Sequence, residues 1–241
     1  MPSPIVSEEN PKKLNEKMPD SIIRSYAVTN GGTYLFDSPQ DPPFVAMALH
    51  GYGQTAELIG AYARRLLGPG PAIAALQGPH PHYLESLPSA KVGYNWGTTA
   101  DWPRAIDLHH RILLQVLAEL PPLPVLLLGF SQPVGLNYRF LATHPGLVRG
   151  AIGLCGGVPK EWTPANRITT PILHIARSED EFFPAPTAVE FEARLRRHSA
   201  DVEFQLIPGQ HRFPSDGRRL IRPWIQRIFN HDLGDLVPVL K

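Results

Sequence analysis

The residues most suited to chemistry lie in the segment LLGFSQ at positions 127–132, where a serine follows an apolar stretch. A serine between a buried strand and a helix sits in a sharp turn that exposes its hydroxyl at the carboxyl edge of a sheet. Gly129, two residues earlier, lets such a turn close. A serine hydroxyl attacks a carbonyl when a base removes its proton and an acid orients that base. The pattern predicts Ser131 as a nucleophile, and its alternative role is that of a helix N-cap.

The acid and the base of this arrangement follow the serine along the chain, in that order. The segment RSEDEFFP at positions 177–184 comes after an apolar run and carries three carboxylates. Asp180 is the best placed of them, because a proline four residues later closes the loop. Glu179 and Glu181 are expected to be solvated charges at the rim.

The base is predicted from the histidines that follow the acid. Only His198, His211 and His231 lie after Asp180. His211 lies in the flexible turn PGQHRF before the last predicted helix, whereas His198 lies near a helix end and His231 near the C-terminus. We therefore expect His211 to be the base.

The segment HGYG at positions 50–53 ends another apolar run. Backbone N–H groups in such a loop, together with the N–H of the residue after the nucleophile, can form an oxyanion hole. We assign these two donors to Tyr52 and Gln132. His50 is expected to brace the loop through a hydrogen bond rather than to titrate in the reaction.

Alternating apolar runs and amphipathic segments predict the elements that position these residues. Strands that are apolar throughout and alternate with helices indicate a mostly parallel sheet covered on both faces, and hence one α/β domain. A hairpin is predicted where 22–28 and 33–36 flank Asn30-Gly31-Gly32. Buried strands are predicted at 44–49, 72–76, 125–128, 151–154, 172–176 and 202–207, and helices at 56–67, 101–120, 131–143, 186–198 and 215–229.

Two segments, 77–99 and 156–170, lack periodicity and are predicted to be long loops. The first carries Tyr83, Tyr94 and Trp96, and the second carries Trp162, aromatic residues that suit the walls of a pocket. Trp96, with Phe182 and Phe213 beside the predicted acid and base, is expected to line an apolar substrate pocket. The alternative for each of these side chains is packing in the core.

Composition excludes several classes of function. The 23 basic and 22 acidic side chains give a net charge of +1, which offers no field for nucleic acid. The single cysteine, Cys155, is expected to be a core residue, and neither His80-Pro81-His82 nor His109-His110 has a nearby carboxylate or cysteine to complete a metal site. We expect no metal, no cofactor and no membrane span. The polar residues 1–20 are predicted to be a flexible tail before one domain at 21–241, and the missing signal segment favours the cytoplasm.

The motifs LHGYGQT, GFSQ, HIARSEDEFFP and PGQHRF resemble the phospholipase/carboxylesterase branch of the α/β-hydrolase superfamily, which includes acyl-protein thioesterases. The resemblance extends from about residue 20 to 230. It implies an α/β-hydrolase fold and a cofactor-free enzyme acting on small carboxylic esters or thioesters. It also implies the roles given above: Ser131 as nucleophile, Asp180 as acid and His211 as base, with the Tyr52 and Gln132 amides at the oxyanion.

The chain departs from this family after the serine. The family has glycine and then another small residue where Pro133 and Val134 stand. A proline restricts the residue before it, Gln132, whose amide the oxyanion needs. The main expectation is a carboxylesterase acting through an acyl-enzyme. The alternatives are a thioesterase or lysophospholipase, a peptidase, an acyltransferase, and a catalytically weak binding protein in which Pro133 distorts the turn that carries Ser131. The sequence does not identify the substrate or the oligomeric state.

Overall fold

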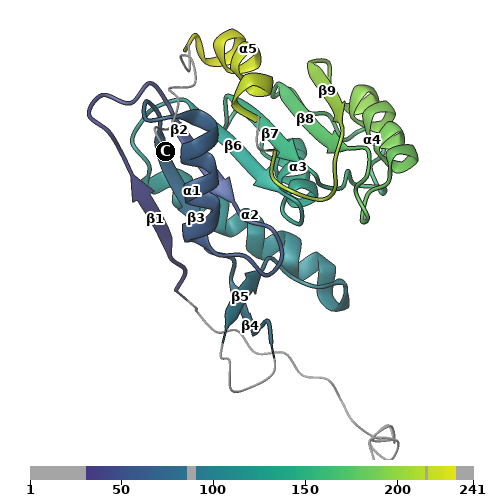
Figure 1. Cartoon of the computed structure of the whole chain (residues 1–241), viewed down its shortest axis with the longest axis horizontal. Coiled ribbons are helices and arrows are strands. Elements are labelled where there is room, and N and C mark those ends of the chain that lie inside the picture. The colour runs from purple at the N-terminus through teal and green to yellow at the C-terminus, as the bar shows by residue number, and fades with distance from the viewer. Residues whose placement is uncertain (1–30, 86–90, 215–216, 232–241) are drawn as a thin grey trace, which may run out of the picture. The chain divides into compact units, whose positions relative to one another are not determined.

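A computed structural model describes residues 31–85, 91–214 and 217–231 of the protein. Within the described residues, seven strands form one sheet in the order β1-β3-β2-β6-β7-β8-β9 (Figure 1). Every neighbouring pair in it is parallel except β1 and β3. The predicted mostly parallel sheet is confirmed. The strands are β1 (Tyr34–Asp37), β2 (Val45–Leu49), β3 (Ala72–Leu76), β6 (Val125–Phe130), β7 (Gly150–Leu154), β8 (Ile172–Arg177) and β9 (Val202–Ile207).

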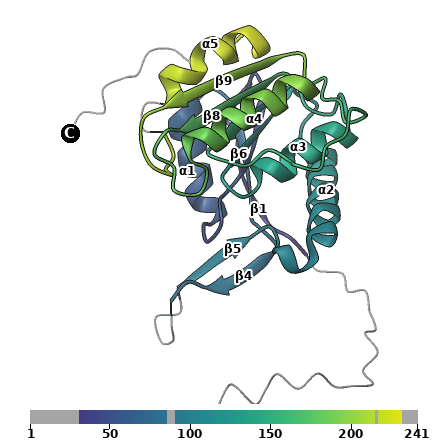
Figure 2. The ribbon, with the colours of Figure 1, turned by 90° about the vertical axis from the view of Figure 1, so that its right-hand side faces the viewer.

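Helices cover both faces of this sheet (Figure 2). Helices α1 (Ala56–Leu67) and α5 (Gly217–Phe229) pack on one face, and α2 (Trp102–Glu119), α3 (Val134–Thr143) and α4 (Ala185–His198) pack on the other. Alternate residues of a strand point to opposite faces. In β2, Ala46 accordingly joins the cluster under α1 while Met47 joins the opposite cluster. Burial on both faces explains why the central strands read as continuous apolar runs.

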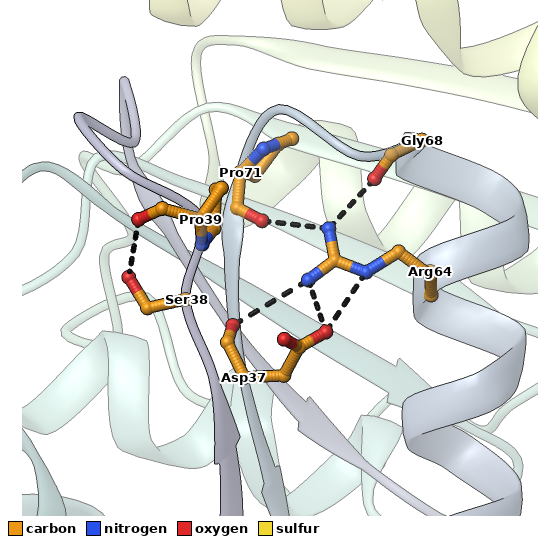
Figure 3. A network of polar contacts seen from close by, with 6 residues as sticks. All are labelled: Asp37, Ser38, Pro39, Arg64, Gly68 and Pro71. Atoms are coloured by element: carbon orange, nitrogen blue, oxygen red, sulfur yellow. Dashed lines mark hydrogen bonds and ion pairs between the residues drawn. The ribbon is translucent and has the colours of Figure 1, made fainter.

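Helix α1 has the bounds that its periodicity predicts. Thr55 caps it by accepting a hydrogen bond from the Leu58 amide, and Gly68 ends it at φ 78°. Arg64 ties this end of the helix to the first strand (Figure 3). Its guanidinium donates to the carbonyls of Gly68 and Pro71, both at 2.8 Å, and pairs with Asp37 at 2.6 Å.

Several predictions fall partly on residues outside the described ranges. The strand predicted at 22–28, the tail at 1–20 and the domain boundary at 21 all lie there, and they stay predictions. The second half of the predicted hairpin corresponds to β1, which pairs with β3. Among the described helices, none is long and apolar enough to cross a membrane.

The prediction of an irregular loop at 77–99 is wrong. Two short antiparallel strands, β4 (His80–Tyr83) and β5 (Val92–Asn95), form an arm there, and a 3-10 turn follows at Thr99–Asp101. Tyr94 also exchanges backbone hydrogen bonds with the 51–54 loop: the Gly53 amide donates to the Tyr94 carbonyl at 2.9 Å, and the Tyr94 amide donates to the Gln54 carbonyl at 3.1 Å. The arm thus supports the loop that carries Tyr52. The segment predicted as a loop at 156–170 contains no helix or strand.

Candidate active site

Ser131 directly follows β6 and adopts φ 62°, in the left-handed region that side chains rarely occupy. The turn is held from both sides. The Ser131 amide donates to the Leu154 carbonyl of β7 at 2.8 Å, and the Val134 amide donates to the Ser131 carbonyl at 3.2 Å. This geometry is that of a strand–turn–helix elbow, in which the hydroxyl is lifted off the end of the sheet.

The three residues predicted to act together are brought together by the structure. His211 Nε2 lies 2.8 Å from Ser131 Oγ, and His211 Nδ1 lies 2.7 Å from Asp180 Oδ2. They come from the loops after β6, β8 and β9, whose carboxyl ends meet at one edge of the sheet. A carboxylate on Nδ1 fixes the tautomer in which Nε2 faces the hydroxyl and can accept its proton.

Asp180 is buried, with 3% of its surface exposed, and both of its oxygens are used. Oδ2 faces the histidine, and Oδ1 accepts hydrogen bonds from the amides of Phe182 and Phe183, both at 2.9 Å. The acid and histidine loops are also joined directly, because the Glu179 amide donates to the Gly209 carbonyl at 3.0 Å. The acid is therefore held in one orientation.

Glu181 has a contact that its sequence position did not reveal. Its side chain is exposed, yet Oε2 accepts a hydrogen bond from the His211 amide at 3.2 Å. Hydrogen bonds from its own amide and from the His211 amide hold the pKa of the Glu181 carboxyl below its usual range. Glu181 therefore anchors the backbone of the histidine, in addition to being a charge at the rim.

The predicted oxyanion donors lie on two loops that touch. No described group accepts a hydrogen bond from the amide of Tyr52 or of Gln132, so both are available to a ligand. A Cβ atom added to Gly51 would lie 3.2 Å from Ser131 Cβ, which shows how closely the first loop approaches Ser131. As predicted, His50 braces this loop: Nδ1 donates to the Gly51 carbonyl at 2.8 Å and Nε2 accepts from the Gly78 amide at 2.9 Å. Burial lowers the pKa of His50 and keeps it neutral.

A side-chain brace joins the two loops that carry the predicted oxyanion donors, and sequence reasoning missed it. Gln132 Oε1 accepts from the Trp96 amide and Nε2 donates to the Gly97 carbonyl, both at 2.9 Å. The Trp96 indole N–H in turn donates to the His50 carbonyl at 2.8 Å. Gln132 is thereby linked, through Trp96, to the start of the loop that carries Tyr52.

Pro133 and Val134 fit into the elbow without its usual glycine. Pro133 lies at φ −74°, which is the natural value for a proline ring, and its carbonyl accepts the first bond of α3, from the Asn137 amide. The bulk of Val134 is accommodated by the neighbouring strand. A Cβ added to Gly153 or Gly156 would lie within 2.8 Å of Val134 side-chain atoms. The glycines that permit close packing therefore stand partly on β7 and the loop after it.

A cavity of about 670 Å³ opens over Ser131 and His211, large enough for a small organic substrate. Phe182 and Phe213 are among its lining residues, as predicted for a pocket. The same expectation for Trp96 is wrong: it is 1% exposed, lies in the core and does not line this cavity. Trp162 likewise packs among Tyr138 and His198 instead of lining the cavity. A loop position alone does not reveal whether a tryptophan turns inward, and the brace described above explains why Trp96 does.

The remaining candidates from the sequence have structural contacts. Burial raises the pKa of the Cys155 thiol to about 12, so it stays protonated. His82 contacts Tyr52 with ring centroids 4.7 Å apart and the rings tilted by 35°, while His109 and His110 lie in a row of aromatic rings between Trp96 and Phe140. Among the described residues, no three His, Cys, Asp or Glu side chains are grouped in a way that could hold a metal ion.

Comparisons with known proteins agree with this architecture. Residues 117–226 match the model of the dienelactone hydrolase family. The structure of a carboxylesterase from Mesorhizobium loti is similar with a TM-score of 0.65, at 23% identity over 77% of this chain and 89% of that chain. The protein has the α/β-hydrolase fold. The resemblance that its motifs carry is confirmed at the level of the fold.

Other structures with the α/β-hydrolase fold give the same result. Acyl-protein thioesterase 2 from Zea mays matches with a TM-score of 0.67, at 16% identity over 83% of this chain and all of that chain (100%). A phospholipase/carboxylesterase from Dyadobacter fermentans matches with a TM-score of 0.62, at 22% identity over 83% of this chain and 98% of that chain. No curated protein sequence matches this chain.

Proposed function

We propose that this α/β-hydrolase-fold protein is a serine hydrolase that cleaves small carboxylic esters. The observation that carries the proposal is the continuous pair of hydrogen bonds from Ser131 Oγ through His211 to the buried Asp180. A serine in a strained elbow, a base oriented by an acid and an open cavity are together what nucleophilic acyl transfer requires. The similarity to carboxylesterases and to an acyl-protein thioesterase supports the same class of reaction.

The reaction that this geometry supports has two steps. In the first, His211 Nε2 takes the Ser131 proton while Oγ attacks the ester carbonyl, and the proton then passes to the departing alcohol. The amides of Tyr52 and Gln132 stabilise the oxyanion, usually the largest single contribution to such catalysis. In the second, His211 takes a proton from water as the water attacks the acyl-enzyme, and it returns this proton to Ser131 Oγ as the bond to the acyl group breaks and the acid leaves. Asp180 stays ionised and stabilises the imidazolium in both steps.

The alternatives differ in the leaving group or in whether the turn that carries Ser131 supports catalysis. A thioesterase or lysophospholipase would use the same residues. A catalytically weak binding protein would follow if Pro133 displaced the Gln132 amide. The ordinary φ of Pro133 and the room given to Val134 by Gly153 and Gly156 favour an active elbow.

A Ser131→Ala variant tests the chemistry. Its hydrolysis of para-nitrophenyl esters should fall by at least about 10⁴-fold, because nucleophile removal leaves only the binding and oxyanion contributions. Ser38→Ala, in which an exposed serine on a different loop is replaced, is the matched control and should keep full activity. A fluorophosphonate probe should label the wild type and not Ser131→Ala.

Two outcomes would contradict the proposal. A Ser131→Ala protein with near wild-type turnover would remove Ser131 from the mechanism. A folded wild type that neither reacts with the probe nor hydrolyses any ester would support the binding-protein alternative. A panel of esters and thioesters of graded acyl length then separates the carboxylesterase from the thioesterase.

A further inference from the structure

The charged side chains that line the cavity are of one sign, whereas Glu181 lies at its rim and is engaged by the His211 amide. Arg65, from the last turn of α1, and Arg212, directly after His211, both line it, and no aspartate or glutamate occurs among the described residues that do. The apolar lining consists mainly of aromatic rings: Tyr52, Tyr62, Phe130, Phe182, Phe183 and Phe213. A cleft with low-dielectric walls and charges of one sign focuses its field on ligands of the opposite sign.

The two guanidinium groups are not used to hold the described structure together. Neither Arg65 nor Arg212 forms an ion pair with a described residue, and both are exposed. The adjacent Arg64 shows the contrast, because its guanidinium is occupied by Asp37 and two backbone carbonyls (Figure 3). Arg212 is fixed through its backbone instead: its amide donates to the Gln210 carbonyl at 2.7 Å and its carbonyl accepts from the Cys155 thiol at 3.5 Å.

Aromatic contacts connect His211 to Arg65 of α1. Phe130 contacts His211 and Phe213, with ring centroids 5.4 and 5.8 Å apart. Phe213 stacks on Tyr62 at 4.6 Å, with the rings inclined by 16°. Arg65 stands one helical turn after Tyr62, and residues three apart lie on the same side of a helix. An apolar wall therefore runs from the catalytic histidine toward a cationic end.

We propose that the cavity selects esters that carry a carboxylate or phosphate group remote from the scissile bond, bound by Arg65 and Arg212. The inference rests on the proposed hydrolase function and names its substrate class. Guanidinium groups hold such oxyanions through paired, charge-assisted hydrogen bonds. The aromatic wall contacts the apolar part of the substrate between the anionic group and the reacting carbonyl.

Matched pairs of esters test this selectivity. Para-nitrophenyl hexanoate is compared with the mono-para-nitrophenyl ester of adipic acid, which adds a carboxylate at the far end of the acyl chain. Phenyl butyrate is compared with its para-carboxy and para-phosphonomethyl derivatives, which carry the anion on the alcohol side. In at least one series the kcat/KM of the wild type should be at least about tenfold higher for the anionic than for the neutral ester. This ratio should decrease as salt is added, because salt screens the attraction between the arginines and the anion. The carboxylate and phosphonate arms separate the two sources of negative charge.

The arginine variants give the decisive comparison. In Arg65→Gln, Arg212→Gln and the double variant, the ratio of kcat/KM for the anionic to the neutral ester should fall, by about tenfold in the double variant. Arg111→Gln removes an exposed positive charge from α2, away from the cavity lining, and should leave the ratio unchanged. The inference is wrong if the cavity variants keep the wild-type ratio, or if the wild type shows no preference.

A binding measurement keeps this inference separate from the chemistry. Phenyl phosphate and phenylacetate are titrated into the Ser131→Ala protein by calorimetry, with toluene as the uncharged counterpart. Binding of an anion that weakens about tenfold in the Arg65→Gln, Ser131→Ala double variant supports the anionic subsite even if the esterase proposal fails. Hydrolysis of neutral esters without anion binding would overturn the subsite and leave the esterase proposal intact.

Discussion

At the scale of single residues, the site depends on backbone positions that only particular residue types allow. Ser131 holds a left-handed conformation, which costs about 1–3 kcal/mol and persists only where the surroundings fix it. Hydrogen bonds to Leu154 and Val134 supply that restraint. Gly51 supplies the complementary condition on the other loop, because only a residue without Cβ leaves the space next to Phe130 and Ser131 free. The proposed nucleophile and oxyanion donors are thus positioned by backbone geometry before any substrate binds.

Gly51→Ala tests this close approach. The added Cβ would lie 3.0 Å from Phe130 Cδ1 and 3.2 Å from Ser131 Cβ, so the Gly51 loop or these neighbours must give by a few tenths of an ångström. We expect kcat for ester hydrolysis to fall by at least about tenfold, since one misplaced oxyanion donor costs up to 10²–10³. Gly32→Ala, where an added Cβ meets nothing within 4 Å, should keep the wild-type kcat. Equal kcat values for the two variants would show that Gly51 does not set the position of the Tyr52 amide.

Gln132→Met tests the side-chain brace at unchanged side-chain length. The variant loses both bonds to the Trp96–Gly97 segment but keeps the backbone amide. We expect kcat to fall by about tenfold with little change in KM, because the brace orients the proposed oxyanion donors and both of its polar atoms are bonded to the Trp96–Gly97 segment. Trp96→Phe, which removes the indole bond to the His50 carbonyl, should show a similar split. If the Gln132 side chain and the Trp96 indole act in one network, the fold decrease in kcat of the double variant is smaller than the product of the two single decreases.

At the scale of elements, the sequence predicts what depends on local periodicity and strand order. The bounds of α1 and the strand before Ser131 can be predicted, because helices and buried strands have their own apolar patterns. The chain order of the proposed serine, acid and base can be predicted as well, because the architecture fixes it. The β4–β5 arm is not readable, since part of its pairing is with residues 51–54 far away in the sequence. Nor does the sequence indicate which of the 23 basic residues face the cavity, because that depends on how α1 meets the histidine loop.

Gly153→Ala tests how α3 is fitted to β7. The added Cβ would lie 2.2 Å from the Tyr138 hydroxyl oxygen and 2.8 Å from Val134 Cγ1, both buried. Overpacking of this kind costs about 1–3 kcal/mol, and we expect the free energy of unfolding in urea to fall by that amount. Tyr138→Phe removes the nearest atom, so the double variant should be destabilised by less than the sum of the single changes. Stability equal to that of wild type would mean that α3 can move away from β7 without cost.

At the scale of the whole molecule, the layers on the two sides of the sheet differ in character. The face under α1 and α5 buries aliphatic and aromatic side chains, whereas the opposite layer also encloses histidines. His109 bonds to Asn137 at 3.1 Å and His174 bonds to the Tyr138 hydroxyl at 2.7 Å. Burial lowers the pKa of each to about 3, so both are neutral in the folded protein at pH 5 and above.

These two histidines predict acid sensitivity of the fold. The pKa values of both histidines in the folded protein lie below the ordinary 6.5, so protonation favours the unfolded chain. Above pH 6.5 both are neutral in the folded and unfolded states, and they do not lower the free energy of unfolding. As the pH falls below 6.5 the unfolded chain binds protons and the free energy of unfolding decreases. At pH 5 each should reduce the free energy of unfolding by about 2 kcal/mol relative to pH 8. In His174→Phe, whose ring can keep the stacking on Phe204, the loss between pH 8 and pH 5 should be smaller by about that amount, measured by urea unfolding at both pH values. A variant that loses as much stability as the wild type over this range would show that His174 does not titrate on unfolding.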